Sequence, residues 1–318
     1  MVLDAATRAF LEAFDKLPKM QDLPIAESRA GMILGQSTGP RLPAEILDRC
    51  IPRGTKHGAD IPIRILRPPN TKGPLPAALY FHGGGWVLGN RDTHDRLLRE
   101  LVHESGVAIV FIEYSLAPEA KFPIAIEEAH AAARWIASHG PELNIDGSRL
   151  ALIGDSSGGN IAAACAHLCK QRGGPHILLQ ILHCPVCDTT FSTPSIREYA
   201  NGPFLTRADM QWFLNHYLAN PSDASNPLVA PLRFAPDQLK GLPPTLILTA
   251  EHDPLRDEAE AYAKNLTDAG VPTVCTRYQS TIHDFLYLNA LAQTPCTRAA
   301  VAQVGAAMRH MLLHPARM

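Results

Sequence analysis

The segment Leu150–Cys165 reads LALIGDSSGGNIAAAC, and it passes from a short apolar run through a glycine- and serine-rich turn into an alanine-rich stretch. This succession predicts a buried strand, a sharp turn and a helix. Ser156 stands at the turn, where Gly154 and Gly158 let the backbone reverse tightly and hold the hydroxyl exposed above a sheet. The helix directs N–H groups and the positive end of its dipole toward the same point, which favours a developing oxyanion. The segment therefore predicts a nucleophilic serine.

The same five-residue spacing of glycine and serine occurs a second time, in Gly35–Gly39 with Ser37 at its centre. Pro40 and Pro43 follow at once and exclude a helix, so Ser37 is predicted to lie in a loop. The segment Gly154–Gly159 also resembles the Gly-Asp-Ser-Gly-Gly signature of trypsin-like proteases. Those domains are built of strands and place their His and Asp before the Ser, whereas here a strand leads into a helix.

The length and composition are those of an ordinary globular chain, with 318 residues, 46% hydrophobic and 19% charged. We expect a single domain, 1–318, made of one core and a cap. The formal net charge of −2 and the isoelectric point near 6.7 provide no basic surface, which argues against nucleic acid and anionic membranes as partners. A neutral or hydrophobic small-molecule substrate fits this charge better.

The N-terminal residues and the cysteines bear on the expected compartment. Charged residues such as Arg8 and Glu12 interrupt the first apolar residues, and no apolar run approaches the length of a membrane span, so we expect no signal peptide and no stable membrane insertion. Seven cysteines, an odd number in a chain that needs no disulfides, predict a reduced, cytoplasmic protein. The pair in Cys184–Cys187 has no second pair at zinc spacing and is interpreted as core packing, as are Cys165 and Cys169.

Eight segments have the pattern of strands, and we place them at 45–52, 60–67, 76–81, 107–114, 149–154, 177–183, 245–250 and 273–279. The first two alternate in polarity around a glycine-containing turn, which predicts an antiparallel hairpin. The others, most of them apolar, alternate with helical segments, including one after Pro123 to about 138, a helix ending near 269, and 299–313. This alternation predicts an α/β fold with a mostly parallel, eight-stranded sheet flanked by helices.

Two segments do not follow this alternation of strands and helices, and they are predicted to form a helical cap over an apolar site. The first, about 1–45, contains helical patterns at 10–17 and 26–34. The second, about 189–226, contains a helix that Thr206 caps and that carries Trp212, Phe213 and Tyr217. Ordinary packing accounts for the same aromatic residues equally well.

A glycine-rich loop, His82–Trp86, follows the third strand. Three successive glycines leave backbone N–H groups accessible, and oxyanions bind where such groups converge. Serine hydrolases on this kind of sheet carry such a loop at this place, so we interpret it as an oxyanion hole; a plain flexible turn is the alternative. His82 is expected to brace the loop.

The order of the candidate catalytic residues along the chain is Ser156, then Asp253 after the strand 245–250, then His283 after the last strand. This order is the one expected for α/β hydrolases. Asp257 is the rival acid, but it lies in the next helix, where the helix dipole explains a carboxylate equally well. His310 and His314 lie on the terminal helix and are interpreted as surface or packing residues.

Five motifs in this order resemble the hormone-sensitive-lipase family of α/β hydrolases, a group of bacterial carboxylesterases: His82–Trp86, Tyr114–Glu119, Gly154–Asn160, Asp253–Asp257 and Ile282–Phe285. The resemblance implies the α/β-hydrolase fold. It also implies a cap built from the N-terminal helices and the insertion after the sixth strand. The oxyanion hole would consist of the N–H groups of Gly84, Gly85 and Ser157, with Gly83 as a further contributor.

Two residues depart from the family pattern. Ser157 stands where the family usually has Ala, which we expect to matter little because the role of this residue is backbone donation. Asp284 stands where the family usually has Gly. A carboxylate turned toward His283 would raise the pKa of that imidazole and move the rise of activity to higher pH.

These motifs predict a serine carboxylesterase that acts through an acyl-enzyme, with no metal and no cofactor. The resemblance to the family implies short- to medium-chain esters as substrates. Trp86 and Phe204 are expected near the mouth of the acyl pocket. A lactonase or an amidase would use the same residues, and a small-ligand receptor on this fold is the alternative from another class. The resemblance also allows a homodimer formed through an edge strand and the terminal helix.

Overall fold

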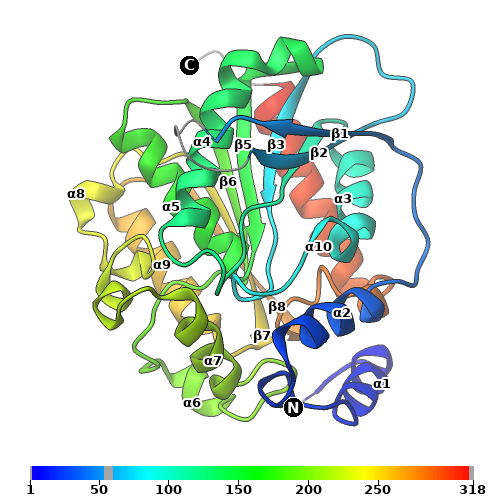
Figure 1. Ribbon diagram of the computed structural model, residues 1–318, viewed down its shortest axis with the longest axis vertical. Coiled ribbons are helices and arrows are strands. Elements are labelled where there is room, and N and C mark those ends of the chain that lie inside the picture. Colours follow the sequence, from blue (N-terminus) through cyan, green and yellow to red (C-terminus); the bar gives the residue numbers. More distant parts are fainter. Residues whose placement is uncertain (1, 54–59, 315–318) are drawn as a thin grey trace.

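A single eight-stranded sheet runs through the molecule in the computed structural model, which describes residues 2–53 and 60–314 (Figure 1). The strand order is β1-β2-β4-β3-β5-β6-β7-β8. The strands are β1 (Glu45–Ile51), β2 (Ile61–Arg67), β3 (Leu75–Phe81), β4 (Ala108–Ile112), β5 (Ile145–Asp155), β6 (Ile177–His183), β7 (Thr245–His252) and β8 (Thr273–Ile282).

The pairing of these strands confirms the mostly parallel sheet predicted from the sequence. β1 pairs with β2 and β2 pairs with β4 in antiparallel register, and the pairs from β4 through β8 are parallel. The turn expected between the first two strands falls at 54–59 and lies outside the described residues. Parallel strands place all their carboxyl ends at one edge of the sheet, which is where ligands bind in open α/β sheets.

Helices cover both faces of the sheet and one of its ends. They are α1 (Ala5–Phe14), α2 (Ile25–Gly35), α3 (Arg91–Ser105), α4 (Ile124–His139), α5 (Ser157–Gln171), α6 (Pro194–Glu198), α7 (Arg207–Tyr217), α8 (Pro236–Leu239), α9 (Arg256–Asp268) and α10 (Pro295–Met308). Short helical turns occur at Met20–Asp22, Gly140–Leu143, Pro221–Ser225, Pro231–Arg233, Asn289–Leu291 and Arg309–Leu313.

The helix boundaries follow the local capping signals. Thr206 caps α7, as predicted, because its side chain accepts the N–H of Asp209. α1 ends at Phe14, earlier than the apolar spacing suggested. α3 is an addition to the helices expected above, and the Asn90 side chain accepts the N–H groups of its first turn. Its polar and charged residues hide the apolar stripe that faces the sheet.

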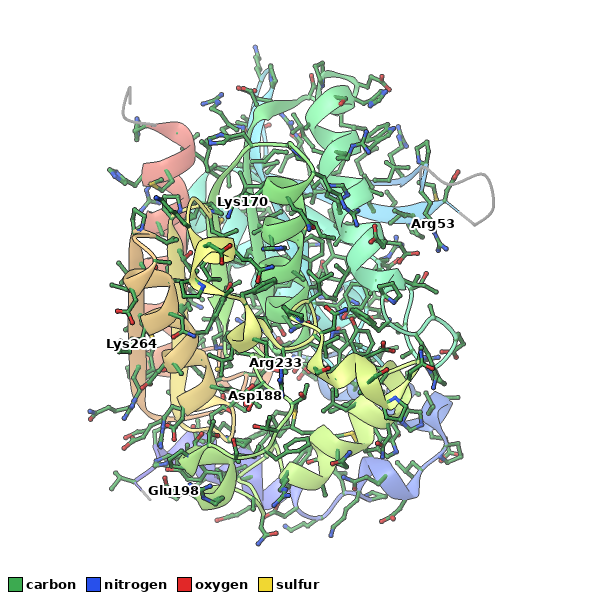
Figure 2. All side chains as sticks on the ribbon, turned by 90° about the vertical axis from the view of Figure 1, so that its left-hand side faces the viewer. Arg53, Lys170, Asp188, Glu198, Arg233 and Lys264 are labelled. Atoms are coloured by element: carbon green, nitrogen blue, oxygen red, sulfur yellow. The ribbon has the colours of Figure 1, made fainter. Side chains whose placement is uncertain are left out.

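The core consists of two apolar layers, one on each face of the sheet. Along β3, Leu79 and Phe81 pack on the face covered by α4 and α5, whereas Ala78 and Tyr80 pack on the face covered by α3 and α10. This alternation is the strand period of two. Charged side chains of the covering helices, such as Lys264 of α9, point outward to solvent (Figure 2). No helix in the described ranges is long and apolar enough to cross a membrane.

α1, α2, α6 and α7 lie together at one end of the molecule, beside the carboxyl ends of β7 and β8 (Figure 1). They come from two parts of the chain that are far apart in sequence. The aromatic rings of Phe10 and Phe14 in α1 contact Phe204, with centroids 5.5 and 4.9 Å apart. These contacts join the N-terminal helices to the segment between β6 and β7.

Candidate active site

Ser156 lies at the junction of β5 and α5, where the chain turns sharply. Its backbone has φ of 53° and ψ of −118°, a conformation that costs about 1–3 kcal/mol for a residue with a side chain. The Ser156 N–H donates to the carbonyl of His183 at 2.8 Å, and its carbonyl accepts the N–H of Val186 at 3.2 Å. These bonds to the segment after β6 hold the turn in place.

The glycines on either side of Ser156 are required by close approach of the backbone. A Cβ at Gly154 would lie 2.3 Å from the carbonyl oxygen of Gly158. A Cβ at Gly158 would lie 2.0 Å from the carbonyl oxygen of Phe81, the last residue of β3. Only glycine therefore lets α5 start this close to the neighbouring strand.

Three strand ends bring Ser156, His283 and Asp253 together. The Oγ of Ser156 lies 3.0 Å from Nε2 of His283, and Nδ1 of His283 lies 2.8 Å from Oδ2 of Asp253. Because a carboxylate only accepts, Nδ1 donates to Asp253, which leaves Nε2 free to accept the Ser156 hydroxyl. Oδ1 of Asp253 accepts the N–H of Leu255 at 2.8 Å, which fixes the carboxylate. All three side chains are buried.

The alternative residues considered from the sequence, Asp257 and Ser37, make hydrogen bonds away from this cluster. Asp257 accepts the N–H of Ser195 at 2.7 Å and the Nε–H of Arg256 at 2.8 Å. Ser37 is exposed, and its hydroxyl donates to the carbonyl of Leu34 at 2.7 Å. Among the described residues, Ser37 has no base bonded to its hydroxyl, and Asp257 has no histidine bonded to its carboxylate, so neither arrangement forms a catalytic triad.

The glycine loop lies beside Ser156, and its first N–H is not free. The N–H of Gly83 donates to Oδ2 of Asp155 at 3.0 Å, so Gly83 leaves the donor set expected from the resemblance. The N–H groups of Gly84, Gly85 and Ser157 bond to no acceptor in the described part of the chain. Three free donors next to the serine hydroxyl are what an oxyanion requires.

His82 and Trp86 flank the glycines, and both are buried. Nδ1 of His82 donates to the carbonyl of Gly83 at 2.7 Å, and its ring stacks on Tyr114, so it braces the loop. Burial and the nearby His94 lower the pKa of His82 to about 4. Trp86 was expected near a pocket mouth, but its indole is 1% exposed because it stacks on Tyr217 of α7.

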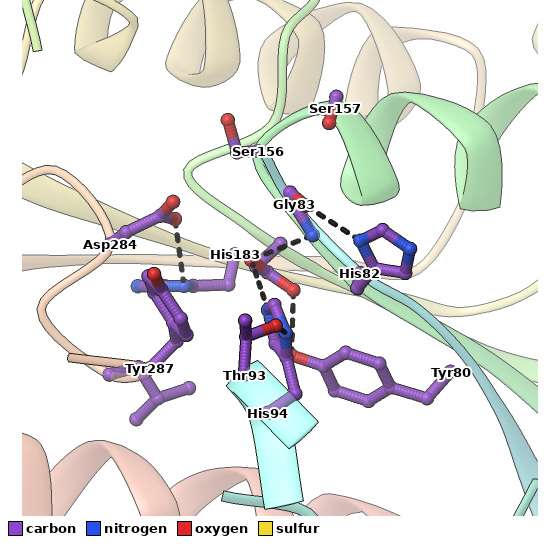
Figure 3. A network of polar contacts seen from close by, with 12 residues as sticks. Tyr80, His82, Gly83, Thr93, His94, Ser156, Ser157, His183, Asp284 and Tyr287 are labelled. Atoms are coloured by element: carbon purple, nitrogen blue, oxygen red, sulfur yellow. Dashed lines mark hydrogen bonds and ion pairs between the residues drawn. The ribbon is translucent and has the colours of Figure 1, made fainter. Parts of the chain in front are cut away.

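A buried polar network lies beside Ser156 and includes Tyr80 and His94 (Figure 3), and its contacts meet on the carboxylate of Asp155. The hydroxyl of Tyr80 donates to Oδ1 at 2.7 Å, and Nε2 of His94 donates to Oδ2 at 3.2 Å. Burial alone would raise the pKa of Asp155, but His94 and Tyr80 more than offset it and lower the pKa to about 2. The network was missed from the sequence because Tyr80 and His94 carry no motif of their own.

Asp284 faces His283 from the side opposite Asp253. Its Oδ2 lies 3.3 Å from Nε2 of His283. Its Oδ1 lies 3.8 Å from Nδ1 of the buried His183 (Figure 3). Burial lowers the pKa of His283, but the charges of Asp253 and Asp284 outweigh it, so the pKa lies well above its usual 6.5. The side chain of Asp284 is thus turned inward, the orientation on which its expected effect depends.

Among the described residues, one group of side chains has the spacing of metal ligands. It consists of Cys184, Asp253 and His283, whose ligand atoms lie within 4.8 Å of one another. A cation there would have to displace the proton that Nδ1 of His283 shares with Asp253. Cys184 and Cys187 are both buried. Burial raises the pKa of Cys184 to about 12, which leaves a neutral thiol rather than the thiolate that binds metals.

His310 and His314, the C-terminal histidines, are exposed. His310 lines a cleft of about 450 Å³ together with Lys170 and Met311, beside the start of β6. This cleft shares no residue with the cluster of Ser156, His283 and Asp253.

Comparison with known proteins identifies the family of this chain. The family model described as the α/β hydrolase fold matches residues 78–287. Among curated proteins, the carboxylesterase NlhH of Mycobacterium tuberculosis is 40% identical over 255 residues, which cover 80% of this chain and 79% of that protein. The ethyl acetate hydrolase of Pseudomonas putida is 36% identical over 242 residues, covering 75% and 76%.

A solved structure shows the same arrangement over nearly the whole chain. The thermostable esterase from Pseudomonas putida superposes with a TM-score of 0.94 and 41% identity, covering 98% of both chains. The fold, the serine turn and these matches agree with one another. The chain therefore belongs to the α/β-hydrolase fold family, within its hormone-sensitive-lipase-like group of esterases.

Proposed function

We propose that the protein is a serine carboxylesterase that hydrolyses carboxylic esters through an acyl-enzyme. Ser156 attacks the ester carbonyl, His283 takes the serine proton and delivers it to the leaving alcohol, and Asp253 stabilises the imidazolium. Water then repeats the sequence and releases the acid. The observation that carries this proposal is the hydrogen-bonded chain from Ser156 through His283 to Asp253, with contacts of 3.0 and 2.8 Å.

The negative charge of each tetrahedral intermediate is assigned to the N–H groups of Gly84, Gly85 and Ser157. These donors are free in the described part of the chain, and the N-terminus of α5 adds its dipole at the same point. The mechanism needs neither a metal nor a cofactor, because the proton moves between protein groups and the charge is held by the backbone.

The proposed substrates are small esters with short to medium acyl chains. The low net charge of the chain supports a neutral substrate, and the related protein from Pseudomonas putida is an ethyl acetate hydrolase. We assign the cap of a single 1–318 domain to residues about 1–45 and about 189–226. The contacts between α1 and Phe204 support this, since they join both segments beside the site.

The test is a chain-length series of p-nitrophenyl esters, from acetate to palmitate, with a lactone and an anilide run alongside. We expect wild type to turn over the short esters fastest, and Ser156→Ala to lose on the order of a million-fold in kcat. Ser37→Ala is the matched control, because it removes the serine of the second glycine-serine-glycine segment and should keep full activity.

Turnover of the lactone or anilide in preference to every ester would replace the esterase proposal with that activity. Binding of an ester without turnover would point instead to a receptor. A large loss in Ser37→Ala with an active Ser156→Ala would overturn the assignment of the nucleophile.

We also propose a cytoplasmic location and a homodimer. All seven cysteines lie among the described residues and are free, as in a reducing compartment. β8 is an edge strand, and Val274 on it is 56% exposed, so a second copy has an unpaired strand edge to pair with. Light scattering across a concentration series, on wild type and Val274→Lys, tests the dimer; a monomer at all concentrations contradicts it.

A further inference from the structure

The two residues that flank the nucleophile in sequence hold the two ends of the glycine loop. Asp155 precedes Ser156, and its carboxylate accepts the N–H of Gly83 at 3.0 Å. Ser157 follows Ser156, and its hydroxyl oxygen accepts the N–H of Trp86 at 3.1 Å. The two free N–H groups of the loop, on Gly84 and Gly85, lie between these two fixed points.

The loop holds part of this shape itself, because the carbonyl of Gly84 accepts the N–H groups of Val87 and Leu88 at 3.1 and 2.8 Å. Gly84 and Gly85 have φ values of 108° and 61°, and glycine loses more conformational freedom on ordering than any other residue. An oxyanion donor works only when it lies about 3 Å from the developing charge, and a displacement of about 1 Å costs as much as a hundredfold in rate. The bonds at Gly83 and Trp86 add constraint from outside the glycines.

The Ser157 hydroxyl constrains the loop through a hydrogen bond that is fully buried. Ser157 is 0% exposed and Trp86 is 1% exposed, so no solvent replaces the bond between them. Ser157 is also the first residue of α5, and its backbone N–H is one of the three proposed oxyanion donors. One residue thus both donates to the oxyanion and fixes the loop that carries the other two donors.

We infer that Ser157 and Asp155 are positioning residues that preorganise the oxyanion hole by fixing the glycine loop relative to Ser156. This inference rests on the proposed function, because it assigns a role within the same acyl transfer. It differs from the expectation that the serine in place of the family's alanine matters little. The Ser157 side chain makes a bond to the loop that alanine cannot make.

The test uses Ser157→Ala, which removes one oxygen and keeps the backbone N–H. Ser105→Ala is the matched control, since Ser105 is equally buried and its hydroxyl accepts a backbone N–H, that of Val107, at 3.2 Å, away from the site. For a short p-nitrophenyl ester, we expect Ser157→Ala to lower kcat about 10- to 100-fold with KM changed less than about threefold. Ser105→Ala should leave both constants unchanged.

A second readout separates positioning from general stability. A trifluoromethyl ketone forms a tetrahedral adduct with Ser156, so its affinity reports on the oxyanion hole directly. The inhibition constant of the ketone should rise in Ser157→Ala by about the factor lost in kcat. Ser157→Ala and Ser105→Ala should unfold at similar temperatures. Asp155→Asn is measured in the same way, because it alters the other end of the loop.

The outcomes distinguish this inference from the proposed function. An unchanged kcat and inhibitor affinity in Ser157→Ala, with an active wild type, overturns the inference and leaves the esterase intact. A loss of unfolding temperature with unchanged kcat per titrated Ser156 assigns Ser157 a structural role only. Absence of ester turnover in wild type removes the proposed function and this inference with it.

Discussion

The imidazole of His283 lies between two carboxylates. Asp253 accepts its Nδ1–H, and Asp284 lies 3.3 Å from Nε2, the same nitrogen that faces the Ser156 hydroxyl. The other ionisable neighbours are Cys184, held neutral by burial, and His183, whose pKa is lowered by burial. Both carboxylate charges favour the imidazolium, so the base becomes available only at a pH above its usual range.

Asp284→Asn should move the rising limb of the pH–rate profile to lower pH. In the proposed mechanism the neutral imidazole is the active form, and the charge of Asp284 raises the pKa of His283. Removing that charge lowers the pKa toward 6.5, so a larger share of His283 is neutral at pH 6–7. The measurement is kcat/KM between pH 5 and 10. Asn keeps the side-chain shape and tolerates the φ of 58° at this position.

Asp257→Asn is the control for this experiment. It removes the carboxylate that serves Arg256 and Ser195, and it should leave the limb where wild type has it. Superimposable profiles for wild type and Asp284→Asn would show that Asp284 does not influence the base. A shift in Asp257→Asn instead would reopen the choice of triad acid.

At the scale of elements, helix α7 packs directly on the glycine loop. A Cβ on Gly85 would lie 2.1 Å from the ring of Phe213, so this glycine is required by the helix above it. The rings of Trp86 and Tyr217 stack with centroids 4.3 Å apart and planes within 2°. The segment between β6 and β7 thereby also supports the loop.

Tyr217→Ala should destabilise the protein by about 3–5 kcal/mol, because it leaves a cavity against Trp86 in a fully buried place. It should also lower kcat, since the glycine loop loses part of its support. Urea unfolding and ester kinetics measure the two effects. Tyr217→Phe is the matched variant: it keeps the stacked ring and removes a hydroxyl that has no partner among the described residues.

We expect the stability of Tyr217→Phe to stay within about 1 kcal/mol of wild type, with kcat unchanged. Equal losses in the Ala and Phe variants would show that the hydroxyl, and not the stacked ring, supports the loop. If Tyr217→Ala is destabilised but keeps the wild-type kcat per folded molecule, the contact with α7 does not contribute to catalysis.

At the scale of the whole molecule, the helices beside the site are joined to each other by an aromatic cluster of Phe10, Phe14 and Phe204. Arg29 of α2 adds a second attachment, because its guanidinium donates to the carbonyl of Val87 at 2.9 Å and pairs with Glu119. The N-terminal helices therefore contact both the insertion and the end of the glycine loop.

Phe204→Ala should loosen α1 without unfolding the sheet. Each aromatic pair contributes about 0.5–1.5 kcal/mol, so the loss of two pairs should speed amide hydrogen exchange in α1 by about tenfold or more. Exchange in β3 and β5 should not change, since their contacts are untouched. Phe204→Leu, which keeps much of the volume, should have a smaller effect. Faster exchange spread evenly over the sheet would contradict a separate role for these helices.

Local patterns were sufficient to predict the main elements of this protein. The spacing of Gly154, Ser156 and Gly158 indicates a tight strand-to-helix turn, and the apolar and alternating patterns predict the eight strands, though not their order in the sheet. The places of Asp253 and His283 after their strands follow from the same patterns, because parallel strands end at one edge. Helix α3 was missed since its polar residues dominate the local signal.

Contacts between distant segments were decided by the tertiary structure alone. Ser157 and Trp86 are 71 residues apart, and Gly83 and Asp155 are 72 apart. The sequence could name the glycine loop, but only the packing of β3 against β5 shows which of its N–H groups are free. The inward turn of Asp284 was likewise decided by the fold. Sequence patterns report the geometry of neighbours along the chain, whereas these distances depend on how the sheet and the surrounding helices pack.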